Sequence, residues 1–78
     1  MTEKERREAL RMQQKELVTM YAAARLIGSR ALEMFEYDKM IVRAHDDLNQ
    51  AYSDARELGE TLSRIIDAID EELNAWPI

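Results

Sequence analysis

Apolar residues recur every seven positions along almost the whole chain. One set, called here the first track, comprises Gln13, Met20, Ile27, Met34, Ile41, Leu48, Ala55, Leu62, Ile69 and Trp76. The second track comprises Leu10, Leu17, Ala24, Ala31, Asp38, His45, Tyr52, Gly59, Ile66 and Leu73. The two tracks lie three or four residues apart, the spacing by which helices bury a seam against one another. The pattern predicts an all-α protein in which helix packs on helix.

A third apolar track indicates a turn in the middle of the chain. Before residue 43 this track follows the second track by four residues and comprises Tyr21, Phe35 and Val42. After residue 43 it precedes the second track by one residue and comprises Ala44, Ala51, Leu58 and Ile65. A single uniform seam would not change flank midway, so the switch favours two helices that fold back on each other.

The turn is expected at about residues 36–39. Asp38 is the least apolar residue on either track, and its carboxylate suits the N-cap of a helix that begins at Lys39. We therefore expect one domain over residues 1–78 in the form of a long helical hairpin. Its helices are expected at about 3–36 and 39–76.

Two other architectures satisfy the same tracks. Gly28 followed by Ser29, and Gly59 followed by Thr61, are typical of a helix end and a new cap, which would give a three-helix bundle. An uninterrupted helix would extend roughly 110 Å and would need a partner along its length, as in a long coiled coil. The apolar phase runs straight through both glycines, and the flank switch disfavours one straight helix, so the hairpin is the favoured architecture.

A single hairpin of this length leaves half of each apolar stripe uncovered. Small chains bury little apolar surface, and the absence of cysteine excludes disulfides as a source of stability. A homodimer that closes into an antiparallel four-helix bundle would cover the stripes. Its expected self-association core comprises Leu17, Met20, Ile27, Met34, Ile41, Leu48, Leu62, Ile66, Ile69 and Leu73.

The charge of the chain is unevenly distributed. The net charge is −5, but residues 1–30 carry seven basic and four acidic side chains, whereas residues 31–78 carry four basic and twelve acidic ones. In a hairpin, the basic N-terminal segment lies beside the acidic C-terminal segment. Basic side chains repel the positive N-terminal end of a helix, and acidic side chains repel its negative C-terminal end. We expect the contact between the two segments to offset both repulsions.

The acidic end has a second interpretation, as a binding surface. Its expected partner-binding residues are Asp67, Asp70, Glu71, Glu72 and Trp76. Carboxylates spaced along a rigid helix can engage a basic protein groove or imitate nucleic-acid phosphates, and a large aromatic side chain beside them can anchor the partner. The sequence leaves intramolecular pairing and partner recognition both open.

Side chains for catalysis or metal binding are few. The one histidine, His45, has Val42 where a helix-bundle metal site would place a glutamate, and there is no cysteine. We expect His45 to be a partly buried core residue instead. Serines and threonines are scattered, and no glycine-rich phosphate loop is present. The sequence therefore predicts a protein that is not an enzyme and uses no cofactor or metal.

The location expected for the chain is the cytoplasm. No stretch approaches the ~18 apolar residues that cross a bilayer, and the opening residues MTEKERREAL lack the apolar core of a signal peptide. The absence of cysteine fits a reducing compartment. We expect no contact with a membrane.

These features predict a non-catalytic protein–protein interaction module that acts as a small regulator, adaptor or inhibitor through its acidic face. Its expected partners are a second copy of itself and an unidentified protein that is basic or associated with nucleic acid. A purely structural oligomerisation module is the first alternative. A small helical dimer that binds nucleic acid through residues 4–15 is the second, which a sequence pI of about 4.8 disfavours. The composition is similar to that of small acidic helical inhibitors encoded by phages and mobile elements.

Overall fold

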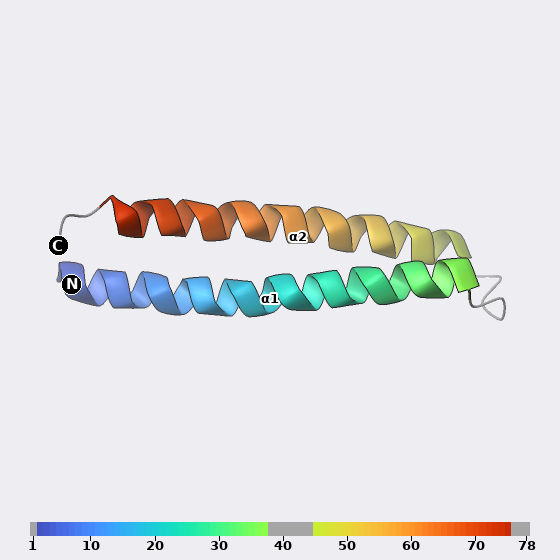
Figure 1. Cartoon of the computed structure of the whole chain (residues 1–78), viewed down its shortest axis with the longest axis horizontal. Coiled ribbons are helices and arrows are strands. Elements are labelled where there is room, and N and C mark those ends of the chain that lie inside the picture. Colours follow the sequence, from blue (N-terminus) through green and yellow to red (C-terminus); the bar gives the residue numbers. More distant parts are fainter. Residues whose placement is uncertain (1, 38–44, 76–78) are drawn as a thin grey trace.

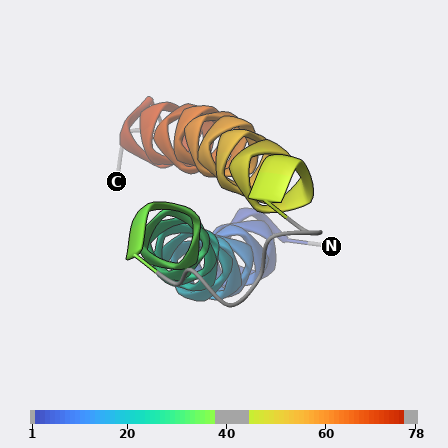
Figure 2. The ribbon, with the colours of Figure 1, turned by 90° about the vertical axis from the view of Figure 1, so that its right-hand side faces the viewer.

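The chain folds into two long antiparallel helices. The structure, a computed structural model, describes residues 2–37 and 45–75. Helix α1 spans Glu3–Tyr37, and helix α2 spans His45–Asn74. They form a rod with extents of 56 × 16 × 15 Å, in which the start of α1 lies beside the end of α2 (Figure 1). Seen along the rod, the two helices lie against each other as a single pair (Figure 2).

The expected helical hairpin is confirmed. Helix α1 ends at Tyr37, and neither Gly28 nor Gly59 interrupts its helix, so the chain does not form the alternative three-helix bundle. Asp38, the expected N-cap of the second helix, lies outside the described residues, as does Lys39. The other two residues of the expected turn, 36 and 37, belong to α1.

Local sequence signals account for where α1 begins. The backbone amide of Glu5 donates a hydrogen bond of 3.2 Å to the Thr2 hydroxyl, and that hydroxyl donates one of 3.2 Å to the Glu5 carboxylate. The Arg6 amide then donates to the Thr2 carbonyl at 3.0 Å, which starts the helical ladder. This arrangement is one half of a capping box: the threonine hydroxyl accepts from the amide three residues later, and the Glu5 carboxylate accepts from that hydroxyl. The first turn of α2 carries Asp46 and Asp47, which favour the positive end of its dipole.

The two helices meet along a seam that advances in alternating steps of three and four residues. The seam residues of α1, all buried or half-buried, are Leu10, Gln14, Leu17, Tyr21, Ala24, Gly28, Ala31 and Phe35. Those of α2 are Leu48, Tyr52, Ala55, Gly59, Leu62, Ile66, Ile69 and Leu73. Such steps keep one stripe of each helix turned toward its neighbour, as in an antiparallel coiled coil.

The seam uses different tracks in the two helices. In α2 it consists of the first and second tracks, as the sequence pattern predicts. In α1 it consists of the second track together with Gln14, Tyr21, Gly28 and Phe35. Met20 and Ile27 of the first track are instead 52% and 60% exposed. The expectation that the first track lies in the seam throughout is therefore wrong for α1. A stripe that contains Gly28 lets the helices approach more closely than one that contains Met20 and Ile27.

Gly28 and Gly59 are buried where each helix packs against the other. A Cβ atom added at Gly28 would lie 3.4 Å from the Cβ atom of Ala55 and 4.0 Å from the ring of Tyr52. A Cβ atom added at Gly59 would lie 3.8 Å from the ring of Tyr21. Neither glycine has a positive φ angle, so the backbone conformation does not require glycine at these positions. The close packing of the two helices accounts for the small residue instead. Each glycine faces the tyrosine of the other helix.

The substitution Gly59→Ala is expected to raise the free energy of unfolding by about 0.5–1 kcal/mol, because alanine favours a helix interior over glycine. The added methyl group would make an ordinary van der Waals contact with Tyr21 at 3.8 Å. Gly28→Ala is the matched comparison and is expected to gain less, since its methyl group would meet Ala55 at 3.4 Å. Urea unfolding followed by circular dichroism measures both. A loss of stability in Gly59→Ala would contradict the open space beside that residue.

Candidate functional site

One flank of the hairpin exposes large apolar side chains from both helices. Met20 and Ile27 stand one residue before seam positions of α1, and Leu58 and Ile65 stand one residue before seam positions of α2. Two antiparallel helices are related by a two-fold axis perpendicular to the plane that contains both of them. Rotation about this axis does not move a residue from one side of that plane to the other. Residues that stand one position before the seam in α1 and in α2 therefore lie on the same side of the seam. These four side chains, called here the apolar flank, are between 42% and 60% exposed.

An ion pair confirms that this geometry applies to the hairpin. Glu72 stands one residue before the seam residue Leu73, and Arg6 stands one residue before Arg7, the half-buried position three residues ahead of Leu10 that continues the seam spacing. Arg6 Nη2 pairs with Glu72 Oε1 across the two helices. Equivalent positions of α1 and α2 therefore do meet on one side.

Large contiguous apolar surfaces are uncommon on proteins that act alone, and they mark places where another molecule docks.

The apolar flank continues the helical pattern outward from the seam. Ala23 lies between Met20 and Ile27 at steps of three and four residues, and Thr61 lies between Leu58 and Ile65 in the same way. Large side chains that alternate with small ones at these steps are typical of a second helix-packing stripe. Each helix thus carries one stripe for the other helix and a second one beside it.

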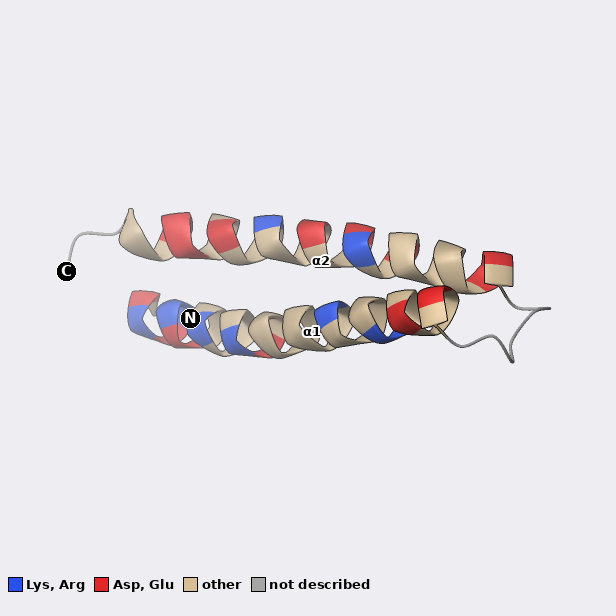
Figure 3. Cartoon of the chain, turned by 45° about the vertical axis from the view of Figure 1, so that its right-hand side comes forward, with Lys and Arg blue, Asp and Glu red and all other residues tan. Residues whose placement is uncertain are grey.

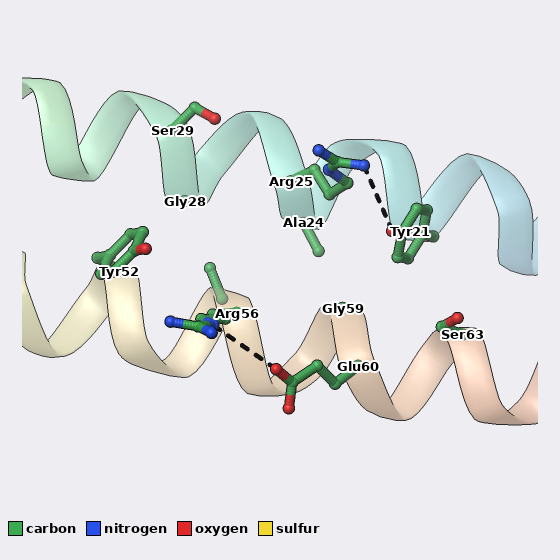
Figure 4. Close-up of a pocket in the computed structure, with 11 residues that line it drawn as sticks. Tyr21, Ala24, Arg25, Gly28, Ser29, Tyr52, Arg56, Gly59, Glu60 and Ser63 are labelled. Atoms are coloured by element: carbon green, nitrogen blue, oxygen red, sulfur yellow. Dashed lines mark hydrogen bonds and ion pairs between the residues drawn. The ribbon is translucent and has the colours of Figure 1, made fainter.

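The opposite flank of the seam holds a groove of about 440 Å³. Its lining residues are Tyr21, Ala24, Arg25, Gly28, Ser29, Tyr52, Ala55, Arg56, Gly59, Glu60 and Ser63. Small residues of both helices leave this space open between the larger side chains on either side (Figure 4). Arg25 and Arg56 each stand one residue after a seam position, which places them on the same flank as each other and opposite the apolar flank.

The groove is built from a repeated motif. Residues 21–28 and 52–59 both read Tyr-x-x-Ala-Arg-x-x-Gly, and antiparallel packing relates the two copies by the same two-fold rotation. The seven-residue tracks do not reveal this motif, because the copies are offset by 31 residues, from Tyr21 to Tyr52, and 31 is not a multiple of seven. A comparison of each half of the chain with the other would have found it.

The two arginines of the motif have different neighbours. The guanidinium of Arg25 lies 5.8 Å from the centroid of the Tyr21 ring, and its Nη1 donates a long hydrogen bond of 3.5 Å to the Tyr21 hydroxyl. Arg56 Nε lies 3.6 Å from Glu60 Oε1, one turn along α2. Figure 4 shows these two contacts as dashed lines and both tyrosine rings between the helices. The groove therefore combines aromatic walls with two cationic groups.

The acidic residues singled out from the sequence divide into two kinds. Glu72 pairs with Arg6, and Asp70 Oδ1 accepts a hydrogen bond of 3.2 Å from Gln14 Nε2. The same Gln14 nitrogen donates to the Ile66 carbonyl at 3.3 Å. These contacts hold the acidic end of α2 beside the basic start of α1, as Figure 3 shows. Asp70 and Glu72 thus take part in the contact between the helices.

The remaining acidic residues face outward. Asp67 and Glu71 are exposed, and neither carboxylate has a hydrogen bond or an ion pair with another residue in the described part of the chain. They stand four residues apart, so they share one face of α2. Trp76, the expected anchor beside them, lies outside the described residues.

The residues expected to form the self-association core occupy different positions in the single chain. Buried in the seam are Leu62, Ile69 and Leu73, and half-buried are Leu17, Met34, Leu48 and Ile66. Met20 and Ile27 are exposed on the apolar flank. Ile41 lies outside the described residues. The structure therefore brings most of this set into the contact between α1 and α2 and leaves two of its members uncovered.

His45 is exposed, so the expectation of a partly buried core histidine is wrong. Its ring stacks on Phe35, with 3.9 Å between ring centroids and 23° between ring planes. Its Nε2 lies 3.2 Å from the Phe35 carbonyl oxygen and donates to it when protonated. The residue ties the start of α2 to the end of α1.

Residues 2–37 and 45–75 contain neither a cluster of metal ligands nor a membrane-spanning helix. No group of three or more histidine, cysteine, aspartate or glutamate side chains there is placed to hold a metal ion. No helix there is both long and apolar enough to cross a membrane. The apolar flank, the groove and the outward acidic face remain as the candidate sites.

No protein-family model, no curated protein and no solved structure matches this chain. The function must therefore be inferred from the surfaces of the hairpin.

Proposed function

We propose that the chain is a cytoplasmic, non-catalytic protein–protein interaction module that acts as a small regulator, adaptor or inhibitor. The apolar flank is the observation that supports this most strongly. Met20, Ile27, Leu58 and Ile65 lie on one side of the hairpin with 42% to 60% of their surface exposed. Exposed apolar area is unfavourable in water by about 25 cal/mol per Å², so a partner that covers this flank is stabilised on binding.

A second copy of the chain is the first partner of the apolar flank, and the product is a homodimeric, antiparallel four-helix bundle. Charges at the edge of the flank favour this pairing. Glu16 and Arg30 stand seven residues before and after Ala23 on α1. When two copies pack antiparallel about Ala23, Glu16 of one copy faces Arg30 of the other. The apolar side chains Met20 and Ile27 lie between these charges, so an isologous interface would cover the apolar side chains and bring Glu16 near an arginine that already pairs with Glu33 at 3.5 Å.

The outward acidic face carries the regulatory function in this proposal. The carboxylates of Asp67 and Glu71 are exposed and make no hydrogen bond or ion pair with another described residue, whereas those of Asp70 and Glu72 contact α1. A basic protein surface, such as one that binds nucleic acid, complements carboxylates held on a rigid helix. The dimer presents this face twice.

The acidic residues provide a direct test of the proposal. The double variant Asp67→Asn, Glu71→Gln is expected to leave the melting temperature unchanged and to slow association with a basic partner, most strongly at low salt. The matched double variant Asp70→Asn, Glu72→Gln removes the same charge, and it also replaces the two carboxylates that contact Gln14 and Arg6 with neutral amides, which accept weaker hydrogen bonds. It is expected to lower the free energy of unfolding by about 0–1 kcal/mol.

Affinity capture from the source cells with both double variants and the parent chain supplies the binding measurement. A protein that the parent retains and the Asp67→Asn, Glu71→Gln variant loses supports the proposal. If all three capture only further copies of the chain, the hairpin is a purely structural oligomerisation module. The capture of nucleic acid in place of protein would favour the alternative in which residues 4–15 bind nucleic acid. The structure disfavours that alternative, because Arg6 of this segment already pairs with Glu72.

A further inference from the structure

The groove opposite the apolar flank has the size of a small-molecule site. Its volume is about 440 Å³, within the roughly 300–1,000 Å³ typical of pockets for small ligands. Its apolar floor consists of Ala24 and Gly28 from α1 and Ala55 and Gly59 from α2. Because these are the smallest side chains, the space above them is open in the folded hairpin and needs no rearrangement to accept a ligand.

Aromatic rings stand at both ends of this floor. Tyr21 of α1 lies against Gly59, and Tyr52 of α2 lies against Gly28, so each ring is held by the opposite helix. Figure 4 shows the two rings between the helices. Flat apolar groups pack favourably on aromatic faces, and a phenolic hydroxyl adds a hydrogen-bond donor beside them.

The rim of the groove is cationic although the chain as a whole is acidic. The lining contains two arginines, Arg25 and Arg56, and one carboxylate, Glu60, in a chain whose net charge is −5. Arg56 Nε is 3.6 Å from Glu60 Oε1, which is too long for a hydrogen bond, so that contact leaves the donors of the guanidinium available. Guanidinium groups bind carboxylates and phosphates through paired N–H donors.

We propose that this groove binds a small organic anion whose flat apolar body lies over the glycine and alanine floor between the tyrosines. Its carboxylate or phosphate group pairs with Arg25 and Arg56, one from each helix. The repeated Tyr-x-x-Ala-Arg-x-x-Gly motif supplies both halves of the site, so the site exists only when α1 and α2 pack together. It lies opposite the apolar flank, and its occupation is compatible with the dimer.

Calorimetric titration of the full chain with four probes tests the proposal. Benzoate and phenyl phosphate represent the two anionic groups on an aromatic body, benzamide is the neutral counterpart, and inorganic phosphate lacks the body. We expect one or both aromatic anions to bind with at least tenfold higher affinity than benzamide and inorganic phosphate. The stronger of the two identifies the anionic group that the site prefers. Equal binding of inorganic phosphate and phenyl phosphate, or no binding of either aromatic anion, would overturn the proposal.

Substitutions in the groove locate the site. Arg25→Gln and Arg56→Gln are each expected to weaken binding about tenfold or more, as expected for loss of a charged hydrogen-bond donor. Arg64→Gln is the matched control, because Arg64 Nη2 donates to Thr61 Oγ1 and lies outside the lining. Gly59→Ala keeps every charge and adds a methyl group to the floor of the groove beside Tyr21, so it is expected to weaken the binding of the aromatic anions. An equal loss in Arg64→Gln, or unchanged binding in both groove arginine variants, would place any binding elsewhere. Circular dichroism checks that each variant is folded.

Discussion

The substitution Leu62→Ala is expected to lower the free energy of unfolding by about 2–5 kcal/mol, the usual range for a buried leucine truncated to alanine. Leu62 is only 4% exposed and sits in the seam of α2. The buried apolar residues of the described chain are Ala24, Ala31, Ala55, Leu62, Ile69 and Leu73. Half of them are alanines, so Leu62 is one of few large side chains that the seam covers. For a domain of this size, the expected loss approaches the whole stability.

Urea unfolding followed by circular dichroism measures this effect, with all variants at the same chain concentration because self-association adds to apparent stability. Leu26→Ala is the matched control. Leu26 is 71% exposed and lies outside both the seam and the apolar flank, so its truncation is expected to change stability by less than about 0.5 kcal/mol. A loss at Leu62 as small as the loss at Leu26 would refute the register of the seam.

The second large effect is on the mass of the particle in solution. Light scattering at micromolar concentration is expected to give twice the chain mass of 9.1 kDa. Ile27→Glu and Leu58→Glu are each expected to reduce the mass to that of one chain. Both residues are at least half exposed in the hairpin but would be covered in the four-helix bundle, where an unpaired carboxylate is strongly unfavourable.

Leu26→Glu is the control for this experiment, because it adds the same charge to an exposed leucine away from the flank. It is expected to leave the doubled mass unchanged. A parent chain that has the mass of one copy at micromolar concentration would contradict the dimer. A doubled mass that survives both Ile27→Glu and Leu58→Glu would move the interface to another surface. Either result would leave the hairpin itself intact.

The arrangement of the hairpin was largely predictable from its sequence. The flank switch near residue 43 correctly indicates two helices and not one, because packing in a seam fixes which residues share a face. The expected end of the first helix at about residue 36 is within one residue of Tyr37. The complementary charge of the two ends predicted their contact, and the pair of Arg6 with Glu72 confirms it.

The candidate sites were less predictable. Met20 and Ile27 follow the same track as Leu62 and Ile69, but the former are exposed and the latter buried. A seven-residue repeat reveals that a face is apolar, yet it does not decide which of three apolar tracks turns toward the neighbouring helix. The groove was missed for a related reason, since its arginines are far apart in sequence and share a flank only after the chain has turned.

The sequence by itself determined the secondary structure, the presence of two helices and the pairing of basic with acidic ends, because these depend on local periodicity and on charge. The tertiary structure alone decided which side chains the seam covers. Gly28 and Gly59 allow close approach, each facing a tyrosine of the other helix. That contact sets the rotation of each helix about its own axis. Rotation then assigns Met20 and Leu58 to one flank and Arg25 and Arg56 to the other, a choice that no spacing along a single helix contains.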